Sequence, residues 1–477
     1  MSSSNTILKK QTLFQMSLYD QLDFTDPLLV LSQMIDWNFI CILLSPFYSE
    51  LGRKSTDLRT YAGLIMLKYL ENHSDESLIQ EYIRNPYYQA FCGATGYNTV
   101  PPCHPSKLSI FREKIGQRGA EIILAASACA YGLEAFDDIV IIDSTAQPKY
   151  IGYPTDKKLA RDILHACRAI AIAENIKLER TFEQIEAKLI KIINFSKNRK
   201  NNGSDDALVE LKKIATALVT HLENKLHEKA IFTYDQKIEL FRRILKQTKN
   251  SKNKIYSIIE PQVQCLIKGK PNHKCEYGSK VGIIISKKSG IILGAISYDG
   301  NPHDSKTMEV SIEQLQRMYS PIYMPSTMIG DLGYRILKTK NQDPFDVQVC
   351  NVKIITPDLL KKLTSDEGRK HLIKQLKSRS KIEPIIGHLK SDYRLSRNFL
   401  HHEIGDKVNC IYSAVAFNLK KVMNAVKAKN DISSLIANYA LITALKSKII
   451  DDIISKKNAK SVVEQNKKSD NLDNKLF

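Results

Sequence analysis

Apolar side chains recur at helical spacing through most of the chain and at strand spacing in a few short runs. The stretch from residue 51 to 131 follows the helical period, and polar residues at Ser74, Asp75 and Ser77 divide the segment GLIMLKYLENHSDESLIQEYI into two helices. The sequence therefore predicts an all-helical N-terminal domain over residues 51–135, preceded by an extension over residues 1–50. Its cations leave two interpretations open: a module for DNA binding or dimerisation, or a solvated charged face.

The first strand signal is the β-branched run Ile139–Ile142, which ends at Asp143. Two apolar runs in SKVGIIISKKSGIILGAISYDG flank the turn residues KKSG and predict a hairpin. A helix over about residues 305–318, an apolar approach to Asp331, a strand in VQVCNVKIITP and further helices follow. These signals indicate a sheet that begins near residue 136.

The segment over about residues 155–264 returns to the helical pattern between the first strand and the hairpin. Such a block predicts a large helical insertion. Without it, the remaining order predicts an α/β domain with a mixed sheet and helices on its faces, spanning residues 136–425. Residues 426–477 are expected to form a helical and disordered tail, because the end of the chain is charged and poor in large apolar groups.

The charge balance points to a polyanionic partner. The 477 residues include 70 Lys and Arg against 51 Asp and Glu, which gives a formal net charge of +19. Release of counterions from phosphates favours such a protein on a nucleic acid, although a biased genome composition also produces basic chains. Nine cysteines without a CxxC pair argue against a zinc knuckle. Since no apolar run is long enough to span a bilayer, a cytoplasmic protein with no membrane partner is expected.

Three acidic residues stand where a sheet presents side chains to a ligand. Asp143 and Asp331 end strands, and Glu383 opens a late helix within SRSKIEPIIGHLKSDYRLSRN. Converging carboxylates suit Mg²⁺, and two such ions about 4 Å apart stabilise the attacking and leaving oxygens of a phosphoryl displacement. A plainer interpretation exists for each residue. An aspartate after a strand often serves a turn or a cap, and Glu383 can pair with Arg379 four residues earlier.

The pattern around Glu383 resembles the DDE transposases of bacterial insertion sequences, in particular the group named after insertion sequence five. That group carries the signature Y-(2)-R-(3)-E-(6)-K around its catalytic glutamate. Arg379, Glu383 and Lys390 fall at the R, E and K positions, whereas Leu376 occupies the tyrosine position. The stretch IEPIIGHLKSDYRLSRNFL is also similar to the family's local sequence.

Other segments extend the resemblance over roughly residues 52–424. VIIDSTAQ resembles the segment of the family's first aspartate and MIGDLGY that of the second, which assigns Asp143 and Asp331. The resemblance implies a ribonuclease-H-like catalytic fold, two Mg²⁺ ions with Mn²⁺ as a substitute, and cleavage and joining at terminal inverted repeats of double-stranded DNA. A homodimer on DNA and a place at the nucleoid of a bacterial cytoplasm follow from the same analogy.

The expected roles follow from side-chain chemistry. Asp143 would bridge both metal ions, while Asp331 and Glu383 would each complete one site. His303 and Asp304, in GNPHDSKT, are candidates for a supporting layer around the site, or for a loop or helix cap. Cationic side chains near the glutamate suit phosphate contact or orientation of Glu383; they are Arg379, Lys381, Lys390, Arg394 and Arg397.

Two alternatives remain beside a transposase. One is a catalytically silent DNA-binding protein derived from such an enzyme, and the other is a metal-dependent nuclease that cuts DNA without joining it. The presence of all three acidic residues favours catalysis. A nuclease and a transposase need the same metal site, so only strand-transfer products discriminate them.

Overall fold

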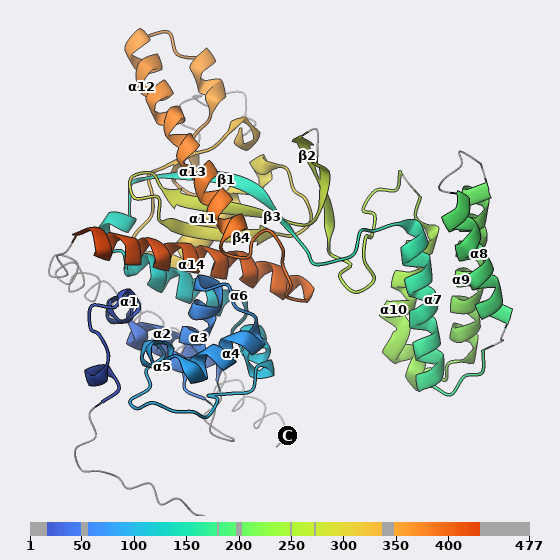
Figure 1. The fold of residues 1–477 in the computed structure, drawn as a ribbon. Helices are drawn as coiled ribbons and strands as arrows, with labels where there is room; N and C mark the ends of the chain where they lie inside the picture. Colours follow the sequence, from blue (N-terminus) through green and yellow to red (C-terminus); the bar gives the residue numbers. More distant parts are fainter. Residues whose placement is uncertain are drawn as a thin grey trace, which may run out of the picture.

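The computed structural model describes residues 17–48, 56–178, 181–196, 203–248, 250–270, 273–335 and 348–429. Helices of the N-terminal part lie on one side of a mixed sheet, and a separate group of helices stands apart from both (Figure 1). The mixed α/β architecture predicted from the sequence is therefore confirmed. The predicted tail over residues 426–477 lies almost entirely outside the described residues.

The N-terminal helices begin at capping side chains. Asp26, Asp36 and Asp57 each accept a backbone N–H at the start of a helix, and Ser74 forms a capping box with Ser77. The predicted break near Ser74 is therefore present. The helices are α1 (Pro27–Met34), α2 (Trp37–Leu44), α3 (Leu58–Leu70), α4 (Asp75–Arg84), α5 (Pro86–Phe91) and α6 (Ser106–Cys129), with short 3-10 turns η1 (Tyr19–Gln21), η2 (Ser45–Phe47) and η3 (Leu133–Ala135).

Helices α1 and α2 lie within the stretch that was expected to be an N-terminal extension. Leu31, Ile40 and Leu44 are fully buried in the same apolar core as α3 and α6. In the described part of the chain no single helix has the length and apolar character to cross a bilayer. The pair Pro27–Met34 and Trp37–Phe47 has both, but it is bent by 57°. The burial of its apolar side chains explains its composition.

The insertion consists of long amphipathic helices with a core of their own. Ile163, Leu211, Leu218 and Phe241 are fully buried in an apolar cluster separate from the core of the sheet. Figure 1 shows these helices in green, beside the rest of the molecule. They are α7 (Asp156–Ala173), α8 (Thr181–Ser196), α9 (Gly203–Lys225) and α10 (Glu228–Lys246).

The sheet is built around β1 (Ile139–Pro148). On one side, β3 (His273–Ser286) pairs antiparallel with β1 and is flanked by β2 (Gln264–Lys270) and β4 (Ile292–Tyr298), both antiparallel to it. The predicted β3–β4 hairpin is present, and Gly290 in its turn has a φ of +67°. On the other side lie β5 (Thr327–Ile329) and β7 (Val352–Ile355), both parallel to β1.

The strand predicted in VQVCNVKIITP is divided into two. Cys350 and Asn351 have φ angles of 48° and 65°, so β6 (Gln348–Val349) turns back antiparallel onto β7. The full order is β2-β3-β1-β5-β7-β6, with β4 also on β3.

Helix α14 (His402–Lys429) joins the sheet to the N-terminal helices. It packs against β4 on one side and against α3 and α6 on the other. Leu64 of α3, Ile283 of β3 and Leu419 of α14 consequently belong to one continuous apolar core. The remaining elements are α11 (Met308–Tyr319), α12 (Asp366–Lys377), α13 (Ile382–Ser391), η4 (Asp304–Lys306), η5 (Leu332–Tyr334), η6 (Pro357–Lys361) and η7 (Ser378–Lys381).

Candidate active site

Asp143 and Asp331 occupy matched positions on neighbouring parallel strands. Ile141 of β1 lies opposite Ile329 of β5, and each aspartate stands two residues further along its chain. The side chains therefore lie side by side where β5 ends, and the carboxyl ends of parallel strands are where α/β proteins bind ligands. The prediction that a strand ends at Asp143 is wrong, because β1 continues to Pro148 and Asp143 lies within it, opposite Ile283 of β3. Asp143 Oδ1 accepts from the Ser144 amide at 2.8 Å, and Asp331 Oδ1 accepts from the amide two residues later at 2.8 Å, as the cap of η5.

Asp304, in the loop after β4, brings a third carboxylate to this edge. Its Oδ1 accepts from Ser144 Oγ at 2.9 Å and lies 2.7 Å from Lys280 Nζ. A Cβ added at Gly333 would lie 2.9 Å from Asp304 Oδ2 and 3.0 Å from Asp331 Oδ1. Gly333 thus provides the space in which these two carboxylates meet.

The electrostatics of Asp143 show how closely the charges gather. Its pKa is raised to about 6, first because the carboxyl is buried. The Ser144 amide lowers this pKa, and the neighbouring Asp331 and Asp304 carboxylates raise it. The Arg379 guanidinium lowers it, so Arg379 lies close enough to act on the site. Partly buried carboxylates that repel one another suit a divalent cation with oxygen ligands.

The oxygen atoms of these side chains are ligands of the kind that a hard cation prefers, but in their present positions they do not form a complete coordination site. In the part of the chain that the structure describes, no three His, Cys, Asp or Glu side chains are placed to hold an ion together as they stand. The carboxylates would have to turn toward an incoming ion.

Glu383 begins helix α13 on its exposed side. The opposite face of this helix, with Ile382, Ile385 and Leu389, is buried against the core. Among the described residues Glu383 makes neither an ion pair nor a hydrogen bond, so the pairing with Arg379 that was considered from the sequence is absent. The structure thus gathers Asp143, Asp331 and Arg379, and no described contact joins Glu383 to them.

Two of the predicted phosphate-binding lysines have protein partners. Lys381 Nζ donates to the carbonyl oxygen of Lys287 in the β3–β4 turn at 3.0 Å. Lys390 Nζ lies 3.8 Å from Glu276 Oε2. Leu376, at the signature tyrosine position, packs at the edge of the main core.

The predicted arginines also contact the protein. Arg394 Nη1 donates to the carbonyl oxygens of Asn72 and His73 and to the Asn72 side chain, at 2.9 to 3.2 Å. This contact joins the segment after α13 to the N-terminal helices. The Arg397 guanidinium stacks on the exposed ring of Tyr150, at 4.2 Å from its centroid.

His303 and the loop around it have a structural role. The His303 side chain accepts from the Ser305 amide at 3.3 Å and caps η4, the turn that carries Asp304. The cap role that the sequence suggested for this region therefore holds for His303, while Asp304 faces the other two aspartates.

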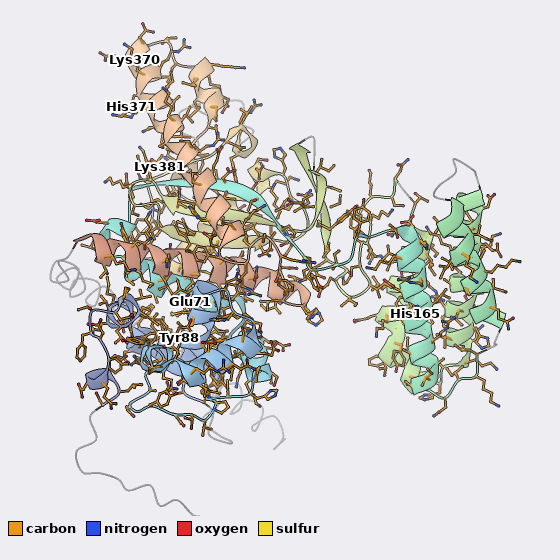
Figure 2. The ribbon with its side chains drawn as sticks, viewed as in Figure 1. Glu71, Tyr88, His165, Lys370, His371 and Lys381 are labelled. Carbon is orange, nitrogen blue, oxygen red and sulfur yellow. The ribbon has the colours of Figure 1, made fainter. Side chains whose placement is uncertain are left out.

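Helix α12 adds a basic arm next to the site. It projects from the sheet, with Lys370 and His371 at its outer part and Lys381 nearer the strands (Figure 2). Exposed cations on this segment are Lys361, Lys362, Arg369, Lys370, Lys374 and Lys377.

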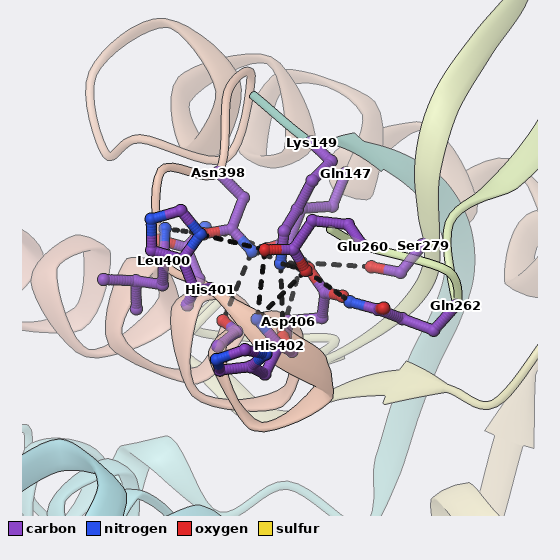
Figure 3. A network of polar contacts seen from close by, with 12 residues as sticks. Gln147, Lys149, Glu260, Gln262, Ser279, Asn398, Leu400, His401, His402 and Asp406 are labelled. Atoms are coloured by element: carbon purple, nitrogen blue, oxygen red, sulfur yellow. Dashed lines mark hydrogen bonds and ion pairs between the residues drawn. The ribbon is translucent and has the colours of Figure 1, made fainter. Parts of the chain in front are cut away.

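A buried polar network supports the far end of β1, and sequence reasoning missed it. Lys149 Nζ lies 2.9 Å from Asp406 Oδ1 and 3.2 Å from Glu260 Oε2, all three side chains being nearly inaccessible (Figure 3). Gln147 donates to Ser279 Oγ at 3.1 Å and to the Asp406 carbonyl at 3.0 Å. The one usable signal in the sequence was the pair of polar residues Gln147 and Lys149, which come after the apolar run at the start of β1.

Comparison with known proteins gives two family matches. Residues 16–114 match the family described as "Transposase domain (DUF772)", and residues 260–419 match the "Transposase DDE domain". The second match contains Asp304, Asp331 and Glu383, whereas Asp143 lies between the two matched regions.

A protein of Rhizobium meliloti, described as "Uncharacterized protein ORF8 in nfe locus", is 30% identical over 181 residues, which are 37% of this chain and 87% of that protein. No solved structure matches the chain. The recognised resemblance is thereby confirmed at the level of the family. This chain belongs to the DDE transposases of insertion sequences, enzymes that act on DNA.

Proposed function

We propose that the chain cleaves transposon ends and transfers them to target DNA with Asp143, Asp331 and Glu383 as its metal-binding carboxylates. The observation that carries the proposal is the meeting of Asp143, Asp331 and Asp304 at one edge of the sheet, beside Arg379. Within the family, the signature spacing supports assignment to the group named after insertion sequence five.

The sheet supports a ribonuclease-H-like catalytic fold. β1 has an antiparallel hairpin on one side and parallel strands on the other. Asp143 lies within this central strand, and Asp331 follows its parallel neighbour β5. Divalent metal ions, Mg²⁺ or Mn²⁺, would supply an activated water and stabilise the charge on the transferred phosphate.

The chain's own residues would do the remaining work. Asp143, Asp331 and Glu383 would hold the divalent metal ions, and Glu383 would have to turn inward from the first turn of α13 to take part. Asp304, which already accepts hydrogen bonds from Ser144 and Lys280, would position the part of β1 next to Asp143 rather than bind an ion. Arg379 would hold a phosphate of the bound strand.

The DNA substrate would be the terminal inverted repeats and a target duplex, bound by a homodimer at the nucleoid. The exposed cations of α12 and of the segment before it support the binding of DNA, because they extend the positive surface away from the carboxylates. The predicted phosphate roles of Lys381, Lys390, Arg394 and Arg397 stay open, since each of these side chains also has a protein partner.

A cleavage and strand-transfer assay tests the proposal on the element's own end DNA with Mg²⁺. We expect Asp143→Asn, Asp331→Asn and Glu383→Gln each to lower the rate at least 100-fold while DNA binding is kept, since each removes a metal ligand. Glu309→Gln, an exposed glutamate at the start of α11, is the matched control and should be fully active.

Each other outcome selects an alternative. Cleavage without joined products would favour a nuclease. DNA binding without cleavage by the wild type would favour a catalytically silent DNA-binding protein. If Glu383→Gln were active and Asp304→Asn inactive, Asp304 would replace Glu383 as the third ligand.

A further inference from the structure

Two exposed rings and a guanidinium form a cluster where the chain leaves β1. Tyr150 is 57% exposed and Phe399 is 47% exposed, and their ring centroids are 4.8 Å apart. The guanidinium carbon of Arg397 lies 4.2 Å from the Tyr150 centroid and 5.7 Å from the Phe399 centroid. We call Tyr150, Arg397 and Phe399 the aromatic platform. Large apolar side chains that cluster on a surface, unlike single ones, mark interaction sites.

The backbone beneath the platform is fixed by buried contacts. The Asn398 amide donates to the Pro148 carbonyl at 2.7 Å, and the Tyr150 amide donates to the Asn398 carbonyl at 2.8 Å. Asn398 is completely buried, and its side chain donates to Asp406 Oδ1 at 2.7 Å within the network of Figure 3. The backbone that carries the exposed rings is therefore preorganised, which lowers the entropic cost of binding a flat ligand.

The positive charge of the platform favours an anionic partner, and its exposed rings favour a partner that contains flat rings. Arg397 is exposed, and the guanidinium carbon of Arg394 also lies 5.6 Å from the Phe399 centroid. A nucleotide has both a ring face that stacks on aromatic or guanidinium planes and a phosphate that a guanidinium attracts. A base inside a duplex has both faces covered, so this surface fits an unpaired nucleotide.

The platform lies close enough to the acidic residues for one DNA strand to contact both. Tyr150 lies two residues beyond the end of β1 and seven residues after Asp143, which amounts to at most about 23 Å of extended backbone. This distance corresponds to about seven nucleotides of a DNA strand. DNA cut beside Asp143 therefore has nucleotides within reach of the platform.

We propose that the aromatic platform binds an unpaired nucleotide of the DNA substrate, whose base stacks on Phe399 and Arg397. This proposal rests on the proposed function in taking DNA as the ligand and in placing the cut beside Asp143. It adds that the enzyme holds an unpaired base at a second place, outside the acidic site.

Fluorescence anisotropy without metal tests the proposal with two probes, a labelled 12-nucleotide single strand and a blunt duplex of the same sequence. Phe399→Ser and the pair Tyr150→Ser with Phe399→Ser should weaken single-strand binding about 5- to 100-fold and duplex binding less than twofold. Arg397→Lys keeps the charge and should weaken the single-strand probe alone. Phe232→Ser, which removes an 89% exposed ring from the insertion, is the control and should change neither.

A 2-aminopurine in the single strand reports stacking directly, because its fluorescence should fall with the wild type and not with Phe399→Ser. Equal losses on both probes, or no loss on either, would overturn the proposal. So would a variant that changes only the monomer–dimer equilibrium in sedimentation, since the surface would then contact a second copy of the chain. Because binding is measured without metal, the binding result can be interpreted even if the protein fails to cleave DNA.

Discussion

At the residue scale, the site is defined by charges that destabilise the protein in the absence of a cation. Asp143 is partly buried, and Asp331 and Asp304 act on it with the same sign of charge. Arg379 lowers the pKa of Asp143, and Lys280 pairs with Asp304, so two cations offset part of this negative charge. Arrangements of this kind are retained for function, because a neutral side chain at the same place would fold with less repulsion.

Asp143→Asn should therefore raise the thermal midpoint of the metal-free protein by about 2 °C or more while abolishing cleavage. Mg²⁺ should raise the midpoint of the wild type in proportion to RT ln(1 + [L]/Kd) and leave the variant unchanged. Differential scanning fluorimetry over a Mg²⁺ series measures both effects. Asp299→Asn, at an exposed aspartate, should respond to Mg²⁺ like the wild type. An undiminished Mg²⁺ response in Asp143→Asn would remove Asp143 from the metal site.

At the element scale, the sequence predicted best where an apolar run ends in a polar residue. The strand that contains Asp143, the approach to Asp331 and the β3–β4 hairpin have a clear period and are present, but β1 continues to Pro148 instead of ending at Asp143. The sequence predicted Asp304 as a candidate but could not place it, because its partners Ser144 and Lys280 lie far away in the chain, on β1 and β3. Arg394 was expected on DNA, and only the tertiary fold brings Asn72 to it.

The packing of the N-terminal helices depends on one carboxylate shared by two cations. Asp75 of α4 binds Lys68 of α3 at 2.6 Å and Arg112 of α6 through both oxygens, at 2.9 and 2.6 Å. The Lys68 and Arg112 side chains are only 5% and 6% exposed. Asp75→Asn leaves both cations without a counter-charge and should lower the free energy of unfolding by about 3–5 kcal/mol at pH 7, measured by urea denaturation.

Lys68 and Arg112 also determine how the stabilisation by the Asp75 carboxylate depends on pH. Burial alone would raise the pKa of Asp75, but Arg112 and Lys68 outweigh it and hold the pKa below the ordinary value of 3.8. The contribution is therefore present above about pH 4 and lost as the pH falls through the lower, folded-state pKa. The difference in the free energy of unfolding between Asp75→Asn and the wild type should therefore become smaller as the pH is lowered. Glu81→Gln, in an exposed pair with Arg84, should cost less than about 0.5 kcal/mol.

At the scale of the whole molecule, the insertion is a separate body joined to the sheet by two neighbouring segments of the chain. Pro148 at its start and Gln264 after its end both pair with Gly278 of β3, one on each side. The two attachment points are thus about 10 Å apart, two strand spacings. The insertion also buries its apolar side chains in its own core. The sheet and the N-terminal helices, by contrast, share one core through α14.

Deleting residues 155–258 and joining the ends with a short Gly/Ser linker should therefore leave a folded protein with a cooperative thermal transition and the same Mg²⁺ response. A deletion longer by four residues, 155–262, is the matched control. It also removes Glu260, leaving buried Lys149 and Asp406 without that partner, and its thermal midpoint should be clearly lower. If both deletions unfolded alike, the insertion would be part of the catalytic core. If both were equally stable, the network at the end of β1 would not anchor the segment that returns from the insertion.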